Sequence, residues 1–220
     1  MLIISVSMVL TNRMKWCKIR TSIIGKTMDL EEKILSGISD FGNRPPKRPL
    51  GFLHTFYLSG TIESPEEYSE WFDAIRMAQE TDIIKIHINS PGGDLFTAIQ
   101  FMRVLQESSA HIIASVEGAC MSAATMIFLQ ARQFEISEHS MFMFHNYSGM
   151  TFGKGGEMID QLQHERKWSD SIMRKVYNGF LTKEEIDSIL DNKDIWMTGD
   201  EVMKRLEKKI KTKKKPTKKR

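Results

Sequence analysis

Two periods of hydrophobic and polar positions follow one another along residues 52–144, and together they predict alternating strands and helices. Isoleucines at 84, 86 and 88 alternate with Lys85 and His87, as in a strand with one buried face. Apolar side chains then recur at three- and four-residue spacing over residues 95–105, as on the buried face of a helix. Further apolar runs predict strands over 52–58, 112–116, 134–136 and 141–144 and a helix over 122–131. This β-α-β-α-β order indicates an α/β fold with a largely parallel sheet.

Helix signals dominate the second half of the chain. The glycines over 153–156 precede a long amphipathic pattern over residues 157–177, which predicts a helix. Ser64, Thr182 and Thr198 each open a capping-box sequence and so predict further helix starts. Residues 1–50 show no sustained period and end in a Pro-rich stretch. We therefore expect an N-terminal arm or linker (1–50), one globular domain (51–207) and a basic tail (208–220), with no internal repeat.

Composition adds limits on location. With 220 residues and 41% hydrophobic content, the chain suffices for one domain with a buried core. Cys17 and Cys120 lie far apart, so neither a disulfide framework nor a metal cluster is expected, and a reducing cytoplasm fits best. The apolar run at the start spans about ten residues, against about 20 for a membrane helix. Basic residues follow this run rather than precede it, so no export signal is expected, and Met28 is an alternative start.

The net charge of +3 hides an asymmetry between body and tail. Residues 204–220 hold eleven Lys or Arg and one acid, a net charge of +10, whereas the other 20 basic and 27 acidic residues give −7. Such a lysine run is typical of a solvated, disordered tail. The alternative is that this tail binds nucleic acid or an acidic partner, although no aromatic side chains interleave to stack on bases.

Three short patches predict the chemistry. A glycine turn is expected at 89–93, Ser122 lies at a strand-to-helix junction, and His145 ends the strand 141–144. Acyl transfer by serine needs a nearby base and N–H groups that stabilise an oxyanion, and these patches offer both. Asp194, next to an apolar segment, is the candidate for orienting the imidazole. Each feature alone also has a structural explanation: a helix cap, a tight turn, a structural histidine, or one acid among 28.

At these residues the chain resembles ClpP, the proteolytic subunit of the Clp protease. That family carries an Asn-Ser-Pro-Gly-Gly segment, a Gly-x-Ala-Ala-Ser-Met nucleophile segment, a Met-Ile-His strand end and a later Arg-Asp-x-Phe-Met-Ser-like segment. The corresponding segments here are 89–93, 118–122, 143–145 and 193–198, in the same order. The resemblance covers about residues 52–207.

The resemblance implies a complete mechanism and assembly. It implies a Ser122-His145-Asp194 triad and an oxyanion hole from the backbone N–H groups of Gly93 and Ala123. It also implies a crotonase-like spiral of β-β-α units with a protruding handle helix, assembled into two stacked heptameric rings. An ATP-driven AAA+ unfoldase would feed protein chains into that chamber. The chain lacks a Gly-x-x-x-x-Gly-Lys-Ser/Thr loop, so ATP would be used by the partner, and no cofactor or metal is expected.

Departures from the family pattern mark an outlying branch. Cys120 and Met121 replace two alanines before the serine, and Ala123 replaces a methionine. Asn146-Tyr147 replaces Gln-Pro, and Lys193 replaces an arginine. ClpP-like chains of this kind include bacteriophage prohead or head-maturation proteases, which would place the protein in the host cytoplasm.

Three functions remain open at the level of sequence. The leading interpretation is a serine endopeptidase that cleaves protein or peptide substrates. The alternatives are a crotonase-fold enzyme acting on acyl-CoA, and a catalytically silent ring subunit or scaffold. A Ser-Lys dyad is disfavoured because no lysine is expected in the apolar environment needed to lower its pKa. The natural substrate stays undefined.

Overall fold

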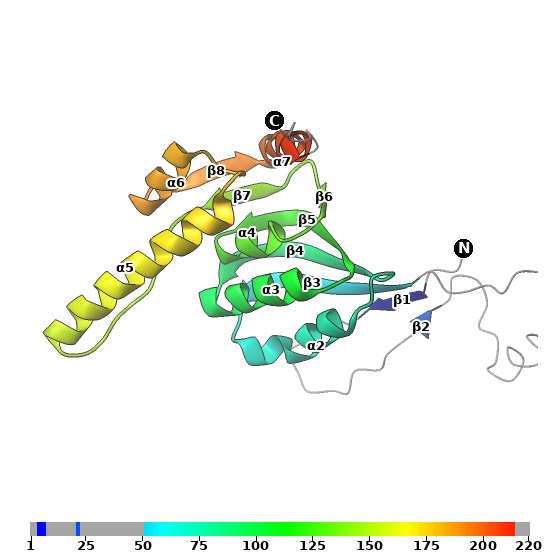
Figure 1. Cartoon of the computed structure of the whole chain (residues 1–220), viewed down its shortest axis with the longest axis horizontal. Coiled ribbons are helices and arrows are strands. Elements are labelled where there is room, and N and C mark those ends of the chain that lie inside the picture. Colours follow the sequence, from blue (N-terminus) through cyan, green and yellow to red (C-terminus); the bar gives the residue numbers. More distant parts are fainter. Residues whose placement is uncertain (1–3, 8–20, 23–50, 214–220) are drawn as a thin grey trace, which may run out of the picture.

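The computed structural model describes residues 4–7, 21–22 and 51–213, and Figure 1 shows their arrangement. In chain order the elements are β1 (Ile4–Ser7), β2 (Thr21–Ser22), β3 (Phe52–Ile62), the 3-10 helix η1 (Pro65–Tyr68), α2 (Ser69–Met77), β4 (Ile83–Gly93), α3 (Leu95–Glu107), β5 (His111–Met121), α4 (Ala123–Phe128), β6 (Gln133–Ile136), β7 (Met141–Phe144), α5 (Gly155–Tyr177), α6 (Lys183–Leu190), β8 (Ile195–Thr198) and α7 (Gly199–Lys213). The sheet order is β2-β1-β3-β4-β5-β7-β8, with β6 also paired to β5. Among the described strands, only the β1–β2 and β7–β8 pairs are antiparallel. The predicted α/β class with a largely parallel sheet is confirmed.

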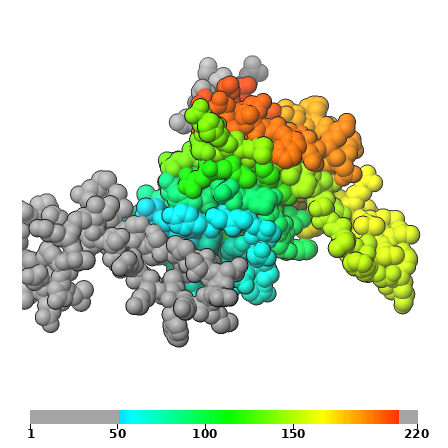
Figure 2. Space-filling view, turned by 180° about the vertical axis from the view of Figure 1, so that it is seen from behind, coloured from blue at the N-terminus to red at the C-terminus, as the bar shows by residue number. Residues whose placement is uncertain are grey.

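The alternation along the central strands decides which face of the sheet is buried. Ile84, Ile86 and Ile88 of β4 are at most 1% exposed and belong to the core that also contains the buried faces of α2, α3 and α4. The intervening positions carry polar side chains: His87 stacks on Tyr57 and pairs with Glu117. Figure 2, the view from behind, shows β3 as a cyan band across the surface.

The helix α5 extends away from the sheet (Figure 1), and its buried side chains, Ser169, Met173 and Tyr177, lie in its C-terminal part. The predicted long helix is therefore confirmed. Thr182 begins α6 with a complete capping box, as predicted. Thr198 and Glu201 bond reciprocally at the start of α7 in the same way. At Ser64 the predicted helix start is confirmed, since Ser64 is the N-cap of η1, but the predicted capping box is not formed, because the Ser64 side chain makes no cap hydrogen bond.

Two further expectations differ from the structure. The predicted glycine turn at 89–93 is wrong: β4 continues to Gly93, because Thr61 and Ile62 of β3 pair with Gly92 and Gly93. The basic tail was expected to be disordered from residue 208, yet α7 continues to residue 213. Cys17, Met28 and most of the predicted arm lie outside the described residues, although β1 adds a parallel strand to β3. Among the residues described, no helix is both long and apolar enough to cross a membrane.

Candidate active site

Ser122 lies on a strained turn between β5 and α4. Its backbone has φ 53° and ψ −128°, a conformation that residues with a side chain rarely adopt. Its N–H donates to the Met143 carbonyl of β7 at 2.8 Å. Its own carbonyl accepts hydrogen bonds from the N–H and the hydroxyl of Thr125, at 2.9 and 2.6 Å. These three hydrogen bonds hold the turn, so the serine backbone is fixed on both sides.

His145 follows the last residue of β7 and contacts the serine directly. Its Nε2 lies 2.6 Å from Ser122 Oγ. The parallel register that pairs Met121 with Met143 brings the ends of β5 and β7 side by side. The carboxyl ends of parallel strands are where α/β sheets place their ligands. At this distance the imidazole can take the hydroxyl proton.

Asp194, the third predicted residue, lies near this pair without touching it. Its side chain is exposed, and among residues 51–209 no hydrogen bond or ion pair joins it to His145. The antiparallel register of β7 and β8 nevertheless pairs Phe144 with Ile195 as its last rung. The next rung would set His145 opposite Asp194, and directly opposite residues project to the same face of a sheet. The structure thus brings Ser122 and His145 into contact. Asp194 lies directly before the last paired residue of β8 and does not contact them.

The end of β4 packs against the serine turn. Gly92 is buried at φ 98°, and a Cβ built on it would lie 2.7 Å from the Ser122 Cβ and 3.1 Å from the Ala123 nitrogen. Only glycine allows this approach. The Asn89 side-chain oxygen accepts the Ala119 N–H at 3.0 Å, which ties the ends of β4 and β5 together. This role of Asn89 was not predicted. A polar residue directly after an alternating strand could have indicated a side-chain hydrogen bond to the neighbouring strand.

A cavity of about 510 Å³ opens onto both Ser122 and His145. Ala123, Met126, Met173 and Tyr177 give it an apolar floor, since each is at most 4% exposed. The Tyr177 hydroxyl lies 2.9 Å from the Thr125 hydroxyl. Burial raises the pKa of Tyr177 to about 12, so this tyrosine stays neutral and serves packing.

Phe96 and Trp168 also line this cavity, and neither was predicted as a site residue from the sequence. The sequence does hold a signal for Phe96. It is a large apolar residue outside the buried face of α3, where packing in the core does not explain it.

Other nucleophiles and metal centres have no support in the described part of the chain. Cys120 is fully buried, and burial raises the pKa of its thiol well above the ordinary value, which keeps it protonated. Within the described residues no three His, Cys, Asp or Glu side chains are grouped as metal ligands.

Comparisons with known proteins show the family and the fold. The sequence model of the Clp protease family matches residues 66–205, more than half of the chain. Among solved structures, the chain is similar to a mutant of ClpP1 from Listeria monocytogenes, with a TM-score of 0.58 and 20% identity. The similarity covers 69% of this chain and 86% of that chain. At this identity it shows a shared fold. No curated protein matches the sequence.

Proposed function

Because the chain belongs to the Clp protease family, we propose that it is a serine endopeptidase with Ser122 as its nucleophile and His145 as its general base. The 2.6 Å contact between Ser122 Oγ and His145 Nε2 carries this proposal. A free serine hydroxyl is a weak nucleophile, and an adjacent base is what activates it. The strained backbone at Ser122 supports the same role, since such strain is concentrated at functional sites.

The reaction takes two acyl transfers. Ser122 Oγ attacks the carbonyl carbon of the peptide while its proton passes to His145 Nε2. The tetrahedral intermediate collapses, the C–N bond breaks, and the leaving amine takes that proton from His145. Water, deprotonated by His145, then attacks the acyl ester. The ester C–O bond breaks, Ser122 Oγ takes the proton back from His145, and the carboxylic acid is released.

We assign the oxyanion hole to the backbone N–H groups of Gly93 and Ala123. The close approach of Gly92 to the Ala123 nitrogen supports this, since it sets the end of β4 beside that amide. Asp94 N already donates to Ile62 O. Because successive N–H groups alternate in direction along a strand, that of Gly93 is directed to the side of Ser122.

We assign the third position of the triad to Asp194. The register of β7 and β8 supports this assignment, because one further rung would pair Asp194 with His145. A carboxylate there would orient the imidazole and stabilise the imidazolium that forms during attack.

The proposed assembly is two stacked heptameric rings joined through α5. The support is the set of apolar side chains exposed on α5 and the preceding loop, which need a partner surface: Met150, Phe152, Ile159 and Leu162. Such a ring in the cytoplasm would receive protein chains from an AAA+ unfoldase that uses ATP, or would act alone as a phage head-maturation protease. The basic tail would contact a nucleic acid or another acidic partner.

A fluorophosphonate probe tests the nucleophile. Wild-type protein is expected to be labelled at Ser122, Ser122→Ala not at all, and His145→Ala far more slowly. Ser148→Ala is the matched control, because Ser148 lines the same cavity and should leave labelling unchanged. Equal labelling of Ser122→Ala and wild type would overturn the proposal.

One observation favours a second candidate, a catalytically silent ring subunit. Asp194 is exposed, and among the described residues no hydrogen bond joins it to His145, so the triad lacks its third contact. A silent subunit would form the ring, as measured by sedimentation, yet resist both labelling and peptide cleavage.

A further inference from the structure

A side-chain hydrogen bond joins the segment after His145 to the segment before Asp194. Asn146 directly follows His145 in the chain, and Asn192 lies two residues before Asp194. The Asn146 Nδ2 group donates to Asn192 Oδ1 at 3.4 Å. This bond therefore connects the two segments whose relative position sets the distance between the imidazole and the Asp194 carboxylate.

The amide of Asn146 is held in one orientation. Its Oδ1 accepts the Tyr147 N–H at 2.9 Å and the Ser169 hydroxyl at 2.7 Å. A backbone N–H can only donate, so the amide atom that faces it must be the oxygen. The amide NH₂ group is then the group directed at Asn192. Ser169 belongs to α5 and is 1% exposed, so this orientation is anchored in the interior of the protein.

The backbone of Asn192 is fixed independently of this bond. Its φ of 63° is left-handed, a conformation that Asn tolerates better than most residues, and its N–H donates to the Ile189 carbonyl at 2.9 Å. This geometry forms the turn between α6 and β8. Because the turn leads directly to Asp194, a shift of the turn would also shift the carboxylate.

The strand ladder ends before it reaches this pair of segments. The last rung of β7 and β8 pairs Phe144 with Ile195, and among the described residues no rung pairs His145 with Asp194. Asn146 lines the active-site cavity and two further cavities of about 760 and 570 Å³. With open space on these sides, the position of Asn146 depends on its hydrogen bonds more than on packing.

We infer that Asn146 is a positioning residue, whose hydrogen bond to Asn192 holds Asp194 within reach of His145. The inference rests on the proposed peptidase function and on the assignment of Asp194 to the triad. Asn146 acts through the segment that carries Asp194, and it needs no contact with the substrate for this role.

Substitutions at Asn192 test the link. Asn192→Gly removes the acceptor oxygen and tolerates the left-handed backbone, whereas Asn192→Asp keeps an acceptor oxygen. With an internally quenched peptide that wild type cleaves, Asn192→Gly should lower kcat about tenfold at an unchanged KM. Asn192→Asp should keep kcat within about twofold of wild type.

Double variants show whether the effect passes through this one bond. Asn146→Ala should also lower kcat about tenfold, and Asn146→Ala/Asn192→Gly should lose no more than either single variant. Independent effects would instead multiply to about 100-fold. Adding Asn192→Gly to Asp194→Asn should change the rate of fluorophosphonate labelling at Ser122 by less than about twofold, because the carboxylate to be positioned is gone.

A matched control removes a different hydrogen bond between the same loop and α5. The Thr151 hydroxyl donates to Gln161 Oε1 at 2.7 Å. Thr151→Val deletes this bond and leaves Asn146 and Asn192 in place, so kcat should stay within about twofold of wild type. Urea unfolding of every variant identifies any loss of activity that comes from loss of the fold.

The outcomes separate the two proposals. If wild type is labelled and cleaves the peptide but Asn192→Gly keeps its kcat, the positioning role is wrong and the peptidase stands. Losses that multiply in the double variant, an equal loss in Thr151→Val, or wild-type labelling of Asp194→Asn also overturn the positioning role. If wild type is neither labelled nor active, the proposed peptidase fails and the inference fails with it.

Discussion

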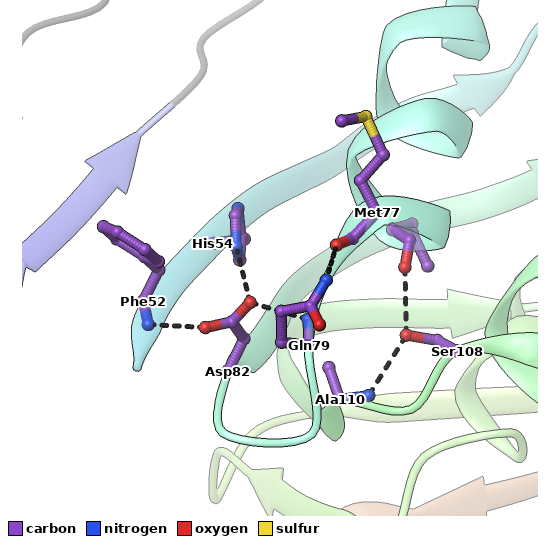
Figure 3. A network of polar contacts seen from close by, with 8 residues as sticks. Phe52, His54, Met77, Gln79, Asp82, Ser108 and Ala110 are labelled. Atoms are coloured by element: carbon purple, nitrogen blue, oxygen red, sulfur yellow. Dashed lines mark hydrogen bonds and ion pairs between the residues drawn. The ribbon is translucent and has the colours of Figure 1, made fainter. Parts of the chain in front are cut away.

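The two ends of the parallel sheet use polar groups in opposite ways. At the end where β3, β4 and β5 begin, a single carboxylate, Asp82, joins the connecting segments (Figure 3). It accepts the Phe52 N–H at 2.8 Å and the Gln79 N–H at 2.7 Å, and His54 lies 3.8 Å away. At the other end, where β4, β5 and β7 finish, the backbone of Ser122 is strained and its hydroxyl faces a cavity.

The Asp82 end is built for stability. Asp82 is 4% exposed, and its own carbonyl accepts the His111 N–H, so one residue holds the starts of three strands. Ser108 supports the same region, since its buried hydroxyl donates to the Ile75 carbonyl and accepts the Ala110 N–H. The difference teaches that this fold joins the starts of its strands through hydrogen bonds, with the buried His54 Nε2 as an exception, and places backbone strain at the opposite end, at Ser122.

The largest effect is expected from Asp194→Asn, which tests whether the reacting end is complete. If Asp194 orients His145, the amide removes the charge that stabilises the imidazolium, and kcat should fall by about 10⁴-fold. Peptide cleavage at saturating substrate measures this change. Asp191→Asn and Asp200→Asn are matched controls, because both are exposed acids near the same strand and should keep wild-type kcat. A loss of only a few-fold in Asp194→Asn would leave a Ser-His pair as the catalytic unit.

Gly92→Ala should have the next largest effect. The added Cβ would lie 2.7 Å from Ser122 Cβ and 2.8 Å from the Met121 carbonyl, so the serine turn must shift. A displacement near 1 Å can reduce the rate about 100-fold, and fluorophosphonate labelling should slow by about that factor. Gly60→Ala is the control, since Gly60 has φ 80° but nothing within 4 Å of its added Cβ. It should lower the free energy of unfolding by about 1 kcal/mol and leave labelling unchanged.

The sequence allowed much of this site to be predicted because its parts are local. The alternation over 84–88 and the apolar run before His145 correctly predicted β4 and β7. Because the sheet is largely parallel here, the ends of these strands lie at the same edge as the end of β5. The glycines at 92 and 93 led to a wrong prediction of a turn, because glycines favour turns in isolation and only pairing with Thr61 and Ile62 keeps these two in the strand. The Phe96–Trp168 stack joins residues 72 positions apart, so no local pattern could reveal it. The position of Asp194 depends on strand register, which the sequence alone left undefined.

Asp82→Ala tests the stable end of the comparison. The substitution leaves the Phe52 and Gln79 N–H groups without their acceptor, and the free energy of unfolding should fall by about 3 kcal/mol. Urea unfolding measures this loss, while labelling of the folded protein at Ser122 should keep its wild-type rate. Glu80→Ala, at an exposed position two residues away, should change stability by less than about 0.5 kcal/mol. A slower labelling rate in Asp82→Ala would show that the two ends are coupled rather than independent.

The smallest effect concerns pH. Burial alone would raise the pKa of Asp82, but the Phe52 and Gln79 N–H groups and His54 outweigh burial and lower it below its ordinary 3.8. A carboxylate with a lowered pKa in the folded state adds stability above its unfolded pKa and loses that stability as the pH falls through the folded value. The stability advantage of wild type over Asp82→Asn should therefore shrink as the pH falls from about 5 towards about 3. Urea unfolding of both proteins across this range measures the difference, and an advantage that grows on acidification would contradict the assigned role of the carboxylate, because protonation must weaken an acceptor of N–H bonds.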